Sequence, residues 1–119
     1  DNCQVGVFLV GVTPAGCALL DQQLYLPKVW ADNPERRDKT HVPAAIRFQT
    51  ELKIAVGLLD RVKAAGHVRL DWVTADETYG RNGTFLDDLE ARGQRYVVEV
   101  PVCVKGATGA MAVVDCPAP

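Results

Sequence analysis

Apolar side chains occupy residues 4–12 (QVGVFLVGV) almost without interruption. A strand covered on both faces shows such a continuous pattern, whereas a half-exposed strand alternates apolar and polar positions. A turn over residues 13–16 (TPAG) and a second apolar segment at residues 17–27 follow. This pattern predicts an antiparallel hairpin whose facing residues have numbers that sum to about 29, so that Cys17 lies near Val12.

The next part of the chain predicts a long loop and then an amphipathic helix. Residues 28–49 carry prolines and mixed charges, and one short helix is expected there, capped by Asn33 with Pro34 at its first position. Thr50 is a residue type that caps helices, and Gly66 is one that ends them. Between them apolar residues recur at helical spacing. These positions are Leu52, Ala55, Val56, Leu59 and Val62.

The last third of the chain predicts a strand, a short helix and another strand, at residues 68–75, 84–92 and 95–100. The order β, β, α, β, α, β is that of an α/β fold with a mixed sheet, in which a β-hairpin is followed by βαβ units. Ligands and catalytic side chains gather at the carboxyl ends of parallel strands in such sheets. Asp76 and Glu77 follow the first of these two strands directly, so the sequence predicts a site there.

Composition and charge limit the classes of protein to which the chain can belong. At 119 residues it is one domain, which buries roughly 65% of the surface of its unfolded chain. The 48% hydrophobic and 24% charged residues exclude disorder as the default. A net charge of -2 without a dense basic tract argues against a nucleic-acid partner. No apolar segment is long enough for a membrane span, so a cytoplasmic protein is expected.

The cysteines and histidines do not form a metal-binding pattern. The four cysteines lie far apart without a CxxC pair, and the chain has two histidines. Zinc sites in proteins need four such ligands at characteristic short spacings. The sequence therefore predicts small buried thiols, no metal and no cofactor.

Four segments together resemble the catalytic core of bacterial insertion-sequence transposases of the DDE type, and the resemblance covers about residues 2–101. The segments are NCQVGVFLVG at 2–11, LLDQQLYLPKVWADN at 19–33, HVP at 41–43 and WVTADETYG at 72–80. The resemblance implies an RNase H-like fold in which three acidic residues hold two divalent cations for phosphoryl transfer. By position, Asp76 matches the second acid of that triad.

The chain departs from this family at both ends of the resemblance. The family's first acid is expected upstream of the first segment and its third acid beyond residue 101, so one carboxylate of three remains, too few for a two-metal site. We therefore expect a truncated RNase H-like domain at residues 1–101 that lacks the usual first strand and is not an active DDE nuclease. Residues 102–119 are expected to form a tail with a strand at about 110–116. This strand would take the place of the missing first strand in the sheet, within the chain or by exchange in a dimer, and would bring Asp115 near Asp76. The alternative is an added edge strand or a loose end.

In length and overall character the chain is similar to the lysinoalanine-forming proteins of cinnamycin-type lanthipeptide gene clusters. This resemblance implies a homodimeric, metal-independent enzyme of antibiotic biosynthesis. It would bind a small thioether-bridged peptide and promote addition of a lysine amine to a dehydroalanine. Holding the two reacting groups together can supply ~7–11 kcal/mol in the best intramolecular cases. The base would come from the protein or from a hydroxylated aspartate of the peptide.

Seven residues are the candidates for a site. Asp76 and Glu77 are the expected catalytic residues, and the expected substrate-binding residues are Trp30, His41, Tyr79, Arg81 and Asp115. Each has a structural alternative, since the two acids can cap the following turn and the others can be core or surface residues. The alternative functions are a catalytically inactive transposase fragment, a residual nuclease, and a non-catalytic domain that binds a peptide or protein. No membrane partner is expected.

Overall fold

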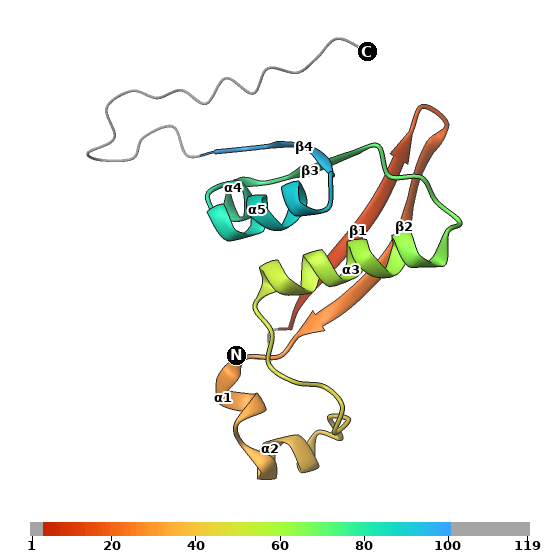
Figure 1. The fold of residues 1–119 in the computed structure, drawn as a ribbon. Coiled ribbons are helices and arrows are strands. Elements are labelled where there is room, and N and C mark those ends of the chain that lie inside the picture. The colour runs from red at the N-terminus through yellow and green to blue at the C-terminus, as the bar shows by residue number, and fades with distance from the viewer. Residues whose placement is uncertain (1–3, 101–119) are drawn as a thin grey trace, which may run out of the picture. The chain divides into compact units, whose positions relative to one another are not determined.

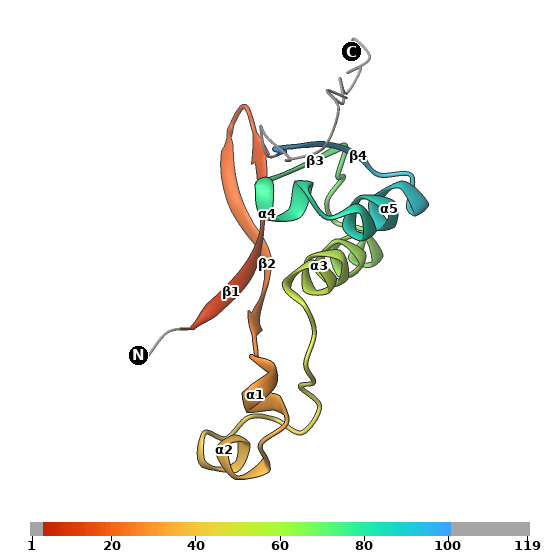
Figure 2. The ribbon, with the colours of Figure 1, turned by 90° about the vertical axis from the view of Figure 1, so that its left-hand side faces the viewer.

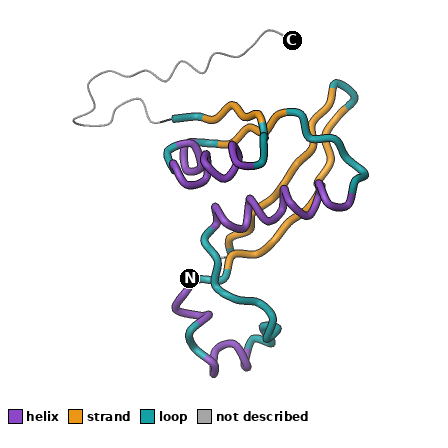
Figure 3. The backbone as a smooth tube through the Cα atoms, viewed as in Figure 1, coloured by secondary structure: helices purple, strands orange, loops and turns teal. Residues whose placement is uncertain are grey.

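The computed structural model describes residues 4–100 and divides the chain into two compact units, Asp1–Arg69 and Leu70–Pro119. The described part of the first unit contains β1 (Val5–Thr13), β2 (Gly16–Tyr25), α1 (Lys28–Ala31), α2 (Pro34–Lys39) and α3 (Glu51–Ala65); that of the second contains β3 (Trp72–Ala75), α4 (Glu77–Gly80), α5 (Gly83–Ala91) and β4 (Arg95–Val98) (Figure 1). The described chain contains both strands and helices, with helices between β2 and β3 and between β3 and β4 (Figure 3), and this confirms the predicted α/β class. None of the helices within residues 4–100 is both long and apolar enough to cross a membrane.

The hairpin β1–β2 has the predicted register near its turn. Val12 pairs with Cys17, and the turn closes at Gly16, whose φ of 146° is a conformation that glycine adopts without strain. An irregularity between Leu9 and Val10 adds one residue to β2 and shifts the rest of the ladder by one position. The two faces of the hairpin are fixed by this register.

Cys17 carries an exposed, free thiol, so the prediction of a buried thiol is wrong at this position. The reason is its place beside Val12, whose side chain is itself 77% exposed. The other three cysteines lie outside residues 4–100.

The core of the first unit lies between α3 and one face of the hairpin (Figure 2). Ile54 and Leu58 of α3 form a buried cluster with Val7 of β1, and Leu9 and Tyr25 pack against it. Burial of each such side chain contributes about 1.5–3 kcal/mol before the entropy of ordering is counted. The cluster therefore holds the helix on the sheet.

A polar contact beside this core joins α3 to β2. The Arg61 guanidinium Nε donates to Asp21 Oδ2 at 2.8 Å, and Asp21 Oδ1 accepts the backbone N–H of Gln22 at 2.8 Å. The bond from Gln22, and then the Arg61 contact, lower the pKa of Asp21 below its ordinary value. The carboxylate thus stays charged and paired at neutral pH.

The segment between β2 and α3 contains the predicted short helix and one that the sequence did not predict. Asn33 caps α2 by accepting a backbone N–H of its first turn, as expected, whereas the four-residue α1 was not predicted. The Arg37 guanidinium donates to the carbonyls of Ala31, Pro43 and Ile46 at 3.3, 3.0 and 2.6 Å. These three bonds fix the loop around α2.

The second unit is a parallel pair of strands with a helical crossover. β3 pairs with β4 over four residues each, and α5 buries Phe85 and Leu89. Gln94 directly precedes β4, and its side chain is buried. Its Nε2 donates to the carbonyls of Asp71 at 3.3 Å and Arg95 at 3.0 Å. The amide thereby satisfies two strand-end carbonyls.

The described strands form two separate sheets of two strands, β1–β2 and β3–β4. The predicted hairpin and the predicted parallel pair are both present, and no strand of residues 4–100 joins them. The strand predicted at about 110–116 lies outside the described residues.

Candidate active site

The acidic pair after β3 belongs to a tight turn. Asp76 is the N-cap of α4, where its Oδ1 accepts the backbone N–H of Thr78 at 2.9 Å. Such a cap stabilises a helix start by about 1 kcal/mol. This confirms that Asp76 caps the turn, and it leaves the second carboxylate oxygen without a hydrogen bond inside residues 4–100.

The turn that carries Asp76 rests on the end of β4. The backbone N–H of Gly80 donates to the Asp76 carbonyl at 2.9 Å, and that of Glu99 donates to the Ala75 carbonyl at 3.0 Å. A Cβ atom at Gly80 would overlap the carbonyl oxygen of Glu99. Glycine is therefore required at position 80 for the close approach that fixes Asp76.

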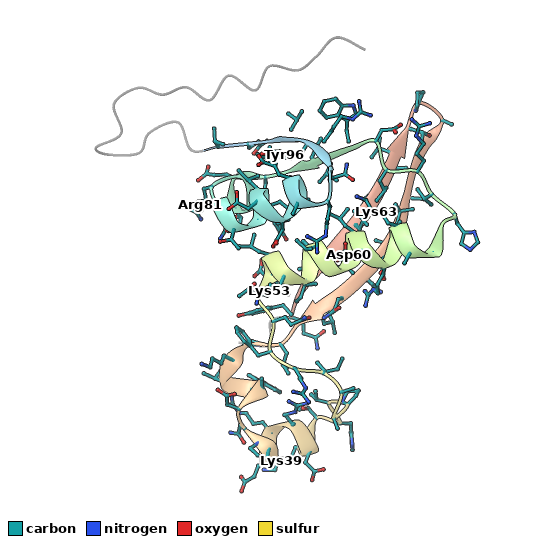
Figure 4. The ribbon with its side chains drawn as sticks, in the orientation of Figure 1. Lys39, Lys53, Asp60, Lys63, Arg81 and Tyr96 are labelled. Carbon is teal, nitrogen blue, oxygen red and sulfur yellow. The ribbon has the colours of Figure 1, made fainter. Side chains whose placement is uncertain are left out.

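Glu77 and Arg81 lie on the outside of the same turn. Their side chains are 54% and 60% exposed, and Arg81 Nη1 lies 4.0 Å from Glu77 Oε1. Figure 4 labels Arg81 beside the helices of the second unit. An exposed pair of this kind contributes about 0–1 kcal/mol. Both groups therefore face solvent, where a ligand can reach them.

Tyr79 is half-buried, and its ring packs on α5. The ring centroid lies 5.4 Å from that of Phe85, with the planes tilted by 57°. Aromatic pairs at this separation and tilt are stabilising. The ring of Tyr79 thus supports the turn from the side of the small core of the second unit.

Trp30 and His41 belong to the first unit. The Arg36 guanidinium lies 5.0 Å from the centroid of the Trp30 ring, a cation–π contact. His41 is exposed and has a φ of 55°, and its backbone N–H donates to the Asp38 carbonyl at 3.2 Å. Non-glycine residues rarely adopt this backbone conformation.

The structure thus brings together four of the seven candidate residues. One turn of the second unit carries Asp76, Glu77, Tyr79 and Arg81. The candidates in the first unit are Trp30 and His41. Asp115 lies outside the described residues, as does its expected approach to Asp76.

An open hollow of about 620 Å³ lies in the first unit, around α2 and the loop that follows it. Its lining includes Arg37, Arg47, Asp32 and Asp38. Two carboxylates and two guanidinium groups give it no preference for one sign of ligand charge. It contains none of the candidate residues.

Sequence reasoning did not anticipate two contacts on β4. The Tyr96 O–H donates to Glu90 Oε1 at 2.7 Å, and this bond raises the pKa of Tyr96 above its ordinary value. The Arg95 guanidinium lies 4.9 Å from the centroid of the Trp72 ring. Tyr96 and Glu90 are six residues apart and belong to different elements, and Arg95 and Trp72 lie on two paired strands, so no local pattern signals either contact.

A divalent metal ion needs several acidic, histidine or cysteine side chains close together. Within residues 4–100, no three His, Cys, Asp or Glu side chains come together as a metal-binding group. Mg²⁺ and Ca²⁺ need several oxygen ligands, of which Asp76 can give one. Residues 4–100 alone therefore do not fit a two-metal centre.

The fold and the capping acid define a class of protein. Asp76 stands at the carboxyl end of a parallel strand in an α/β domain, the place where sites of this class of protein usually lie. The family described as DDE superfamily endonuclease matches residues 1–114, and the chain belongs to this family. No curated protein and no solved structure gave a significant match.

The family explains the arrangement of the described elements. Two small sheets and five helices in residues 4–100 are consistent with part of an RNase H-like DDE domain. The matched range continues to residue 114, beyond residue 101, where the resemblance in the sequence was expected to end.

Proposed function

We propose that Asp76 is a catalytic carboxylate of a DDE-type centre that cleaves DNA with the help of divalent metal ions. The observation that carries this proposal is the place of Asp76 at the carboxyl end of β3, in a chain of the DDE superfamily endonuclease family. The resemblance of the segment around it to the second acid of the DDE triad supports the same role.

The local structure favours a carboxylate that keeps a fixed position. One oxygen of Asp76 is held by the Thr78 backbone, and the turn rests on β4 through Gly80. The second oxygen points to no hydrogen-bond partner among the described residues. An oxygen that is held in place but has no partner suits a metal ligand, because the carboxylate is already oriented before the metal ion binds.

The remaining carboxylates of the centre must come from outside residues 4–100. This follows because Asp76 has no two acidic, histidine or cysteine companions in the described part. In the proposal they lie outside residues 4–100, and Asp76 alone gives no activity.

The distribution of charge supports separate roles for the two units. Residues 70–100 contain seven acidic residues and three arginines, whereas residues 4–69 contain nine lysines and arginines and six acidic residues. The acidic unit attracts cations, and the basic unit attracts phosphates. DNA contact is therefore proposed for the first unit, although the net charge of the whole chain is -2.

The test is cleavage of supercoiled DNA by the full-length protein in the presence of Mn²⁺. An Asp76→Asn variant keeps a capping oxygen, because asparagine caps helices about as well as aspartate, but it loses the charge. We expect its cleavage rate to fall by roughly a hundredfold or more, the usual effect of removing one group that stabilises the transition state. EDTA should abolish cleavage by the unaltered protein.

The matched control is Asp87→Asn, which removes an exposed acid of α5 from the same unit. It should cleave at the rate of the unaltered protein, and thermal unfolding should show that both variants are folded. Absence of metal-dependent cleavage, or equal cleavage by the Asp76→Asn variant, would contradict the proposal.

Lysinoalanine formation stays a prediction from the sequence, and no described contact favours it over DNA cleavage. Its expected substrate-binding residues Trp30 and His41 do not line the described hollow. The two functions respond differently to EDTA, since amine addition to dehydroalanine needs no metal. Incubation with a dehydroalanine-containing lanthipeptide precursor in EDTA, followed by thiol labelling and mass spectrometry, tests it directly. Loss of thiol reactivity at unchanged mass would establish it.

A further inference from the structure

One face of the hairpin β1–β2 is apolar and exposed. Five large apolar side chains on it are half-exposed or more: Phe8 at 57%, Val10 at 50%, Val12 at 77%, Leu19 at 55% and Leu24 at 60%. Soluble monomers rarely expose a contiguous apolar patch larger than a few hundred Å² unless it is an interaction site. We refer to these five residues as the outer face.

The strand register shows that the outer face is continuous. Val10 pairs with Leu19, and paired residues of antiparallel strands lie on the same side of the sheet. The Phe8 ring lies over Gly6, which pairs with Leu24, so aromatic surface fills the space that a side chain at Gly6 would take. The row runs from one end of the hairpin to the other.

The outer face is opposite the one that packs on α3. Val7, Leu9 and Tyr25 face the helix, and the alternation of strand residues turns the five apolar side chains the other way. The sequence of β1 predicts a strand covered on both faces, but within the described part of the first unit only the helix side is covered. The uncovered side calls for a further layer.

We propose that the outer face is covered by the outer face of a second copy of this chain. The five side chains expose on the order of 100 Å² each, so two copies would bury on the order of 1,000 Å², about the smallest area of a specific interface. The other residues of this face that pair across the hairpin are uncharged as well: Gly6, Cys17 and Gln22. In a two-fold symmetric dimer the same surface of both copies meets, so residues of one type lie near each other. Because this face is uncharged, the two copies do not repel each other.

The test is the self-association of the full chain, measured by sedimentation equilibrium. Val12→Glu places a charge on the most exposed position of the outer face and should raise the dimer dissociation constant by roughly a hundredfold. Val29→Glu is the matched control, because Val29 of α1 is an apolar residue exposed by 69% in the same unit but outside the hairpin. It should leave the dissociation constant unchanged.

The thiol of Cys17 gives a second measurement, since it stands beside Val12 on the outer face. Its alkylation, followed by peptide mapping, should be slow at concentrations where the dimer forms and should become fast on dilution. A monomeric protein with a fast-reacting Cys17 would overturn the proposal. Slow alkylation at every dilution would also overturn it, because another segment of the same chain would then cover the face. If Val12→Glu and Val29→Glu weakened the dimer equally, the dimer interface would not lie on the outer face.

Discussion

Gly80, which has no side chain, helps to position the side chain of Asp76. The glycine allows the turn after β3 to lie against the Glu99 carbonyl, and its own N–H is bonded to the carbonyl of Asp76. The segment WVTADETYG thus ends a strand on an acid because the acid caps the turn, and it ends the turn on a glycine because β4 lies against it. The sequence analysis singled out Asp76, but only the fold shows that the acid and the glycine belong to one arrangement.

The first prediction concerns Gly80→Ala. The added methyl group must displace backbone rather than a flexible side chain, so we expect a loss of about 1–3 kcal/mol in the free energy of unfolding. Urea denaturation measures it. Gly83→Ala is the control, since a Cβ atom there meets nothing within 4 Å and alanine favours the helix. Equal unfolding free energies for the two variants would show that the close approach at Gly80 carries no constraint.

A second prediction concerns the titration of Tyr96. Its hydrogen bond to Glu90 raises the pKa of its phenol above the ordinary value of 10.0. The folded state therefore favours the protonated phenol. The resulting stabilisation is fully present below the ordinary pKa and is lost as pH rises through the raised one.

Tyrosinate absorbance during alkaline titration measures this effect. In a Glu90→Gln variant, the Tyr96 phenol should titrate at lower pH than in the unaltered protein, because the bond to a charged acceptor is gone. A Tyr96→Phe variant assigns the step. A titration curve unaffected by the Glu90 substitution would refute the assignment of the raised pKa to this bond.

At the level of helices and strands, residues with strong local preferences determined what could be predicted. Thr50 caps α3 by accepting the Lys53 N–H, and Gly66 ends it with a φ of 72°, both as the sequence indicates. The one-turn helices α1 and α4 were not predicted, because four residues are too few to show a helical period. The ends of α3 could therefore be predicted from its capping residues, whereas helices of a single turn could not be predicted from the sequence.

Two further errors have tertiary causes. The predicted strand at 68–75 is shorter in the structure, because β3 pairs only over the four residues opposite β4. The apolar positions predicted for α3 omitted Ile54 and Leu58, which form its contact with the hairpin. α3 buries side chains over more than one stripe, and a single-stripe pattern cannot represent that.

The third prediction tests this contact. Leu58→Ala removes a side chain that is 1% exposed and packs with Val7 and Ile54. Such truncations leave a cavity and cost about 2–5 kcal/mol in unfolding free energy. Val29→Ala, at a position 69% exposed, should change it by no more than about 0.5 kcal/mol. Urea denaturation compares the two, and equal small changes would mean that the cluster does not hold α3 on the hairpin.

For the chain as a whole, the sequence identified the class of fold and the residue at the carboxyl end of β3, because both depend on local patterns. It could not identify what covers each face of β1. The continuous apolar pattern of that strand predicts two covered faces, and α3 covers one of them. The sequence of β1 does not say what packs on its second face. The proposal that a second copy of the chain packs there rests on the structure of the hairpin.

The last prediction follows from linking folding to association. If two copies cover each other's outer face, the dimer is more stable than its separated subunits, and its melting temperature rises with protein concentration. A tenfold higher concentration adds about 1.4 kcal/mol per dimer, which corresponds to a rise of a few degrees for a domain of this size. Calorimetry over a series of concentrations measures it. The Val12→Glu variant should show this rise only at concentrations roughly a hundredfold higher, whereas Val29→Glu should behave as the unaltered chain. A concentration-independent melting temperature of the unaltered chain would mean that its hairpin is not stabilised by a second copy.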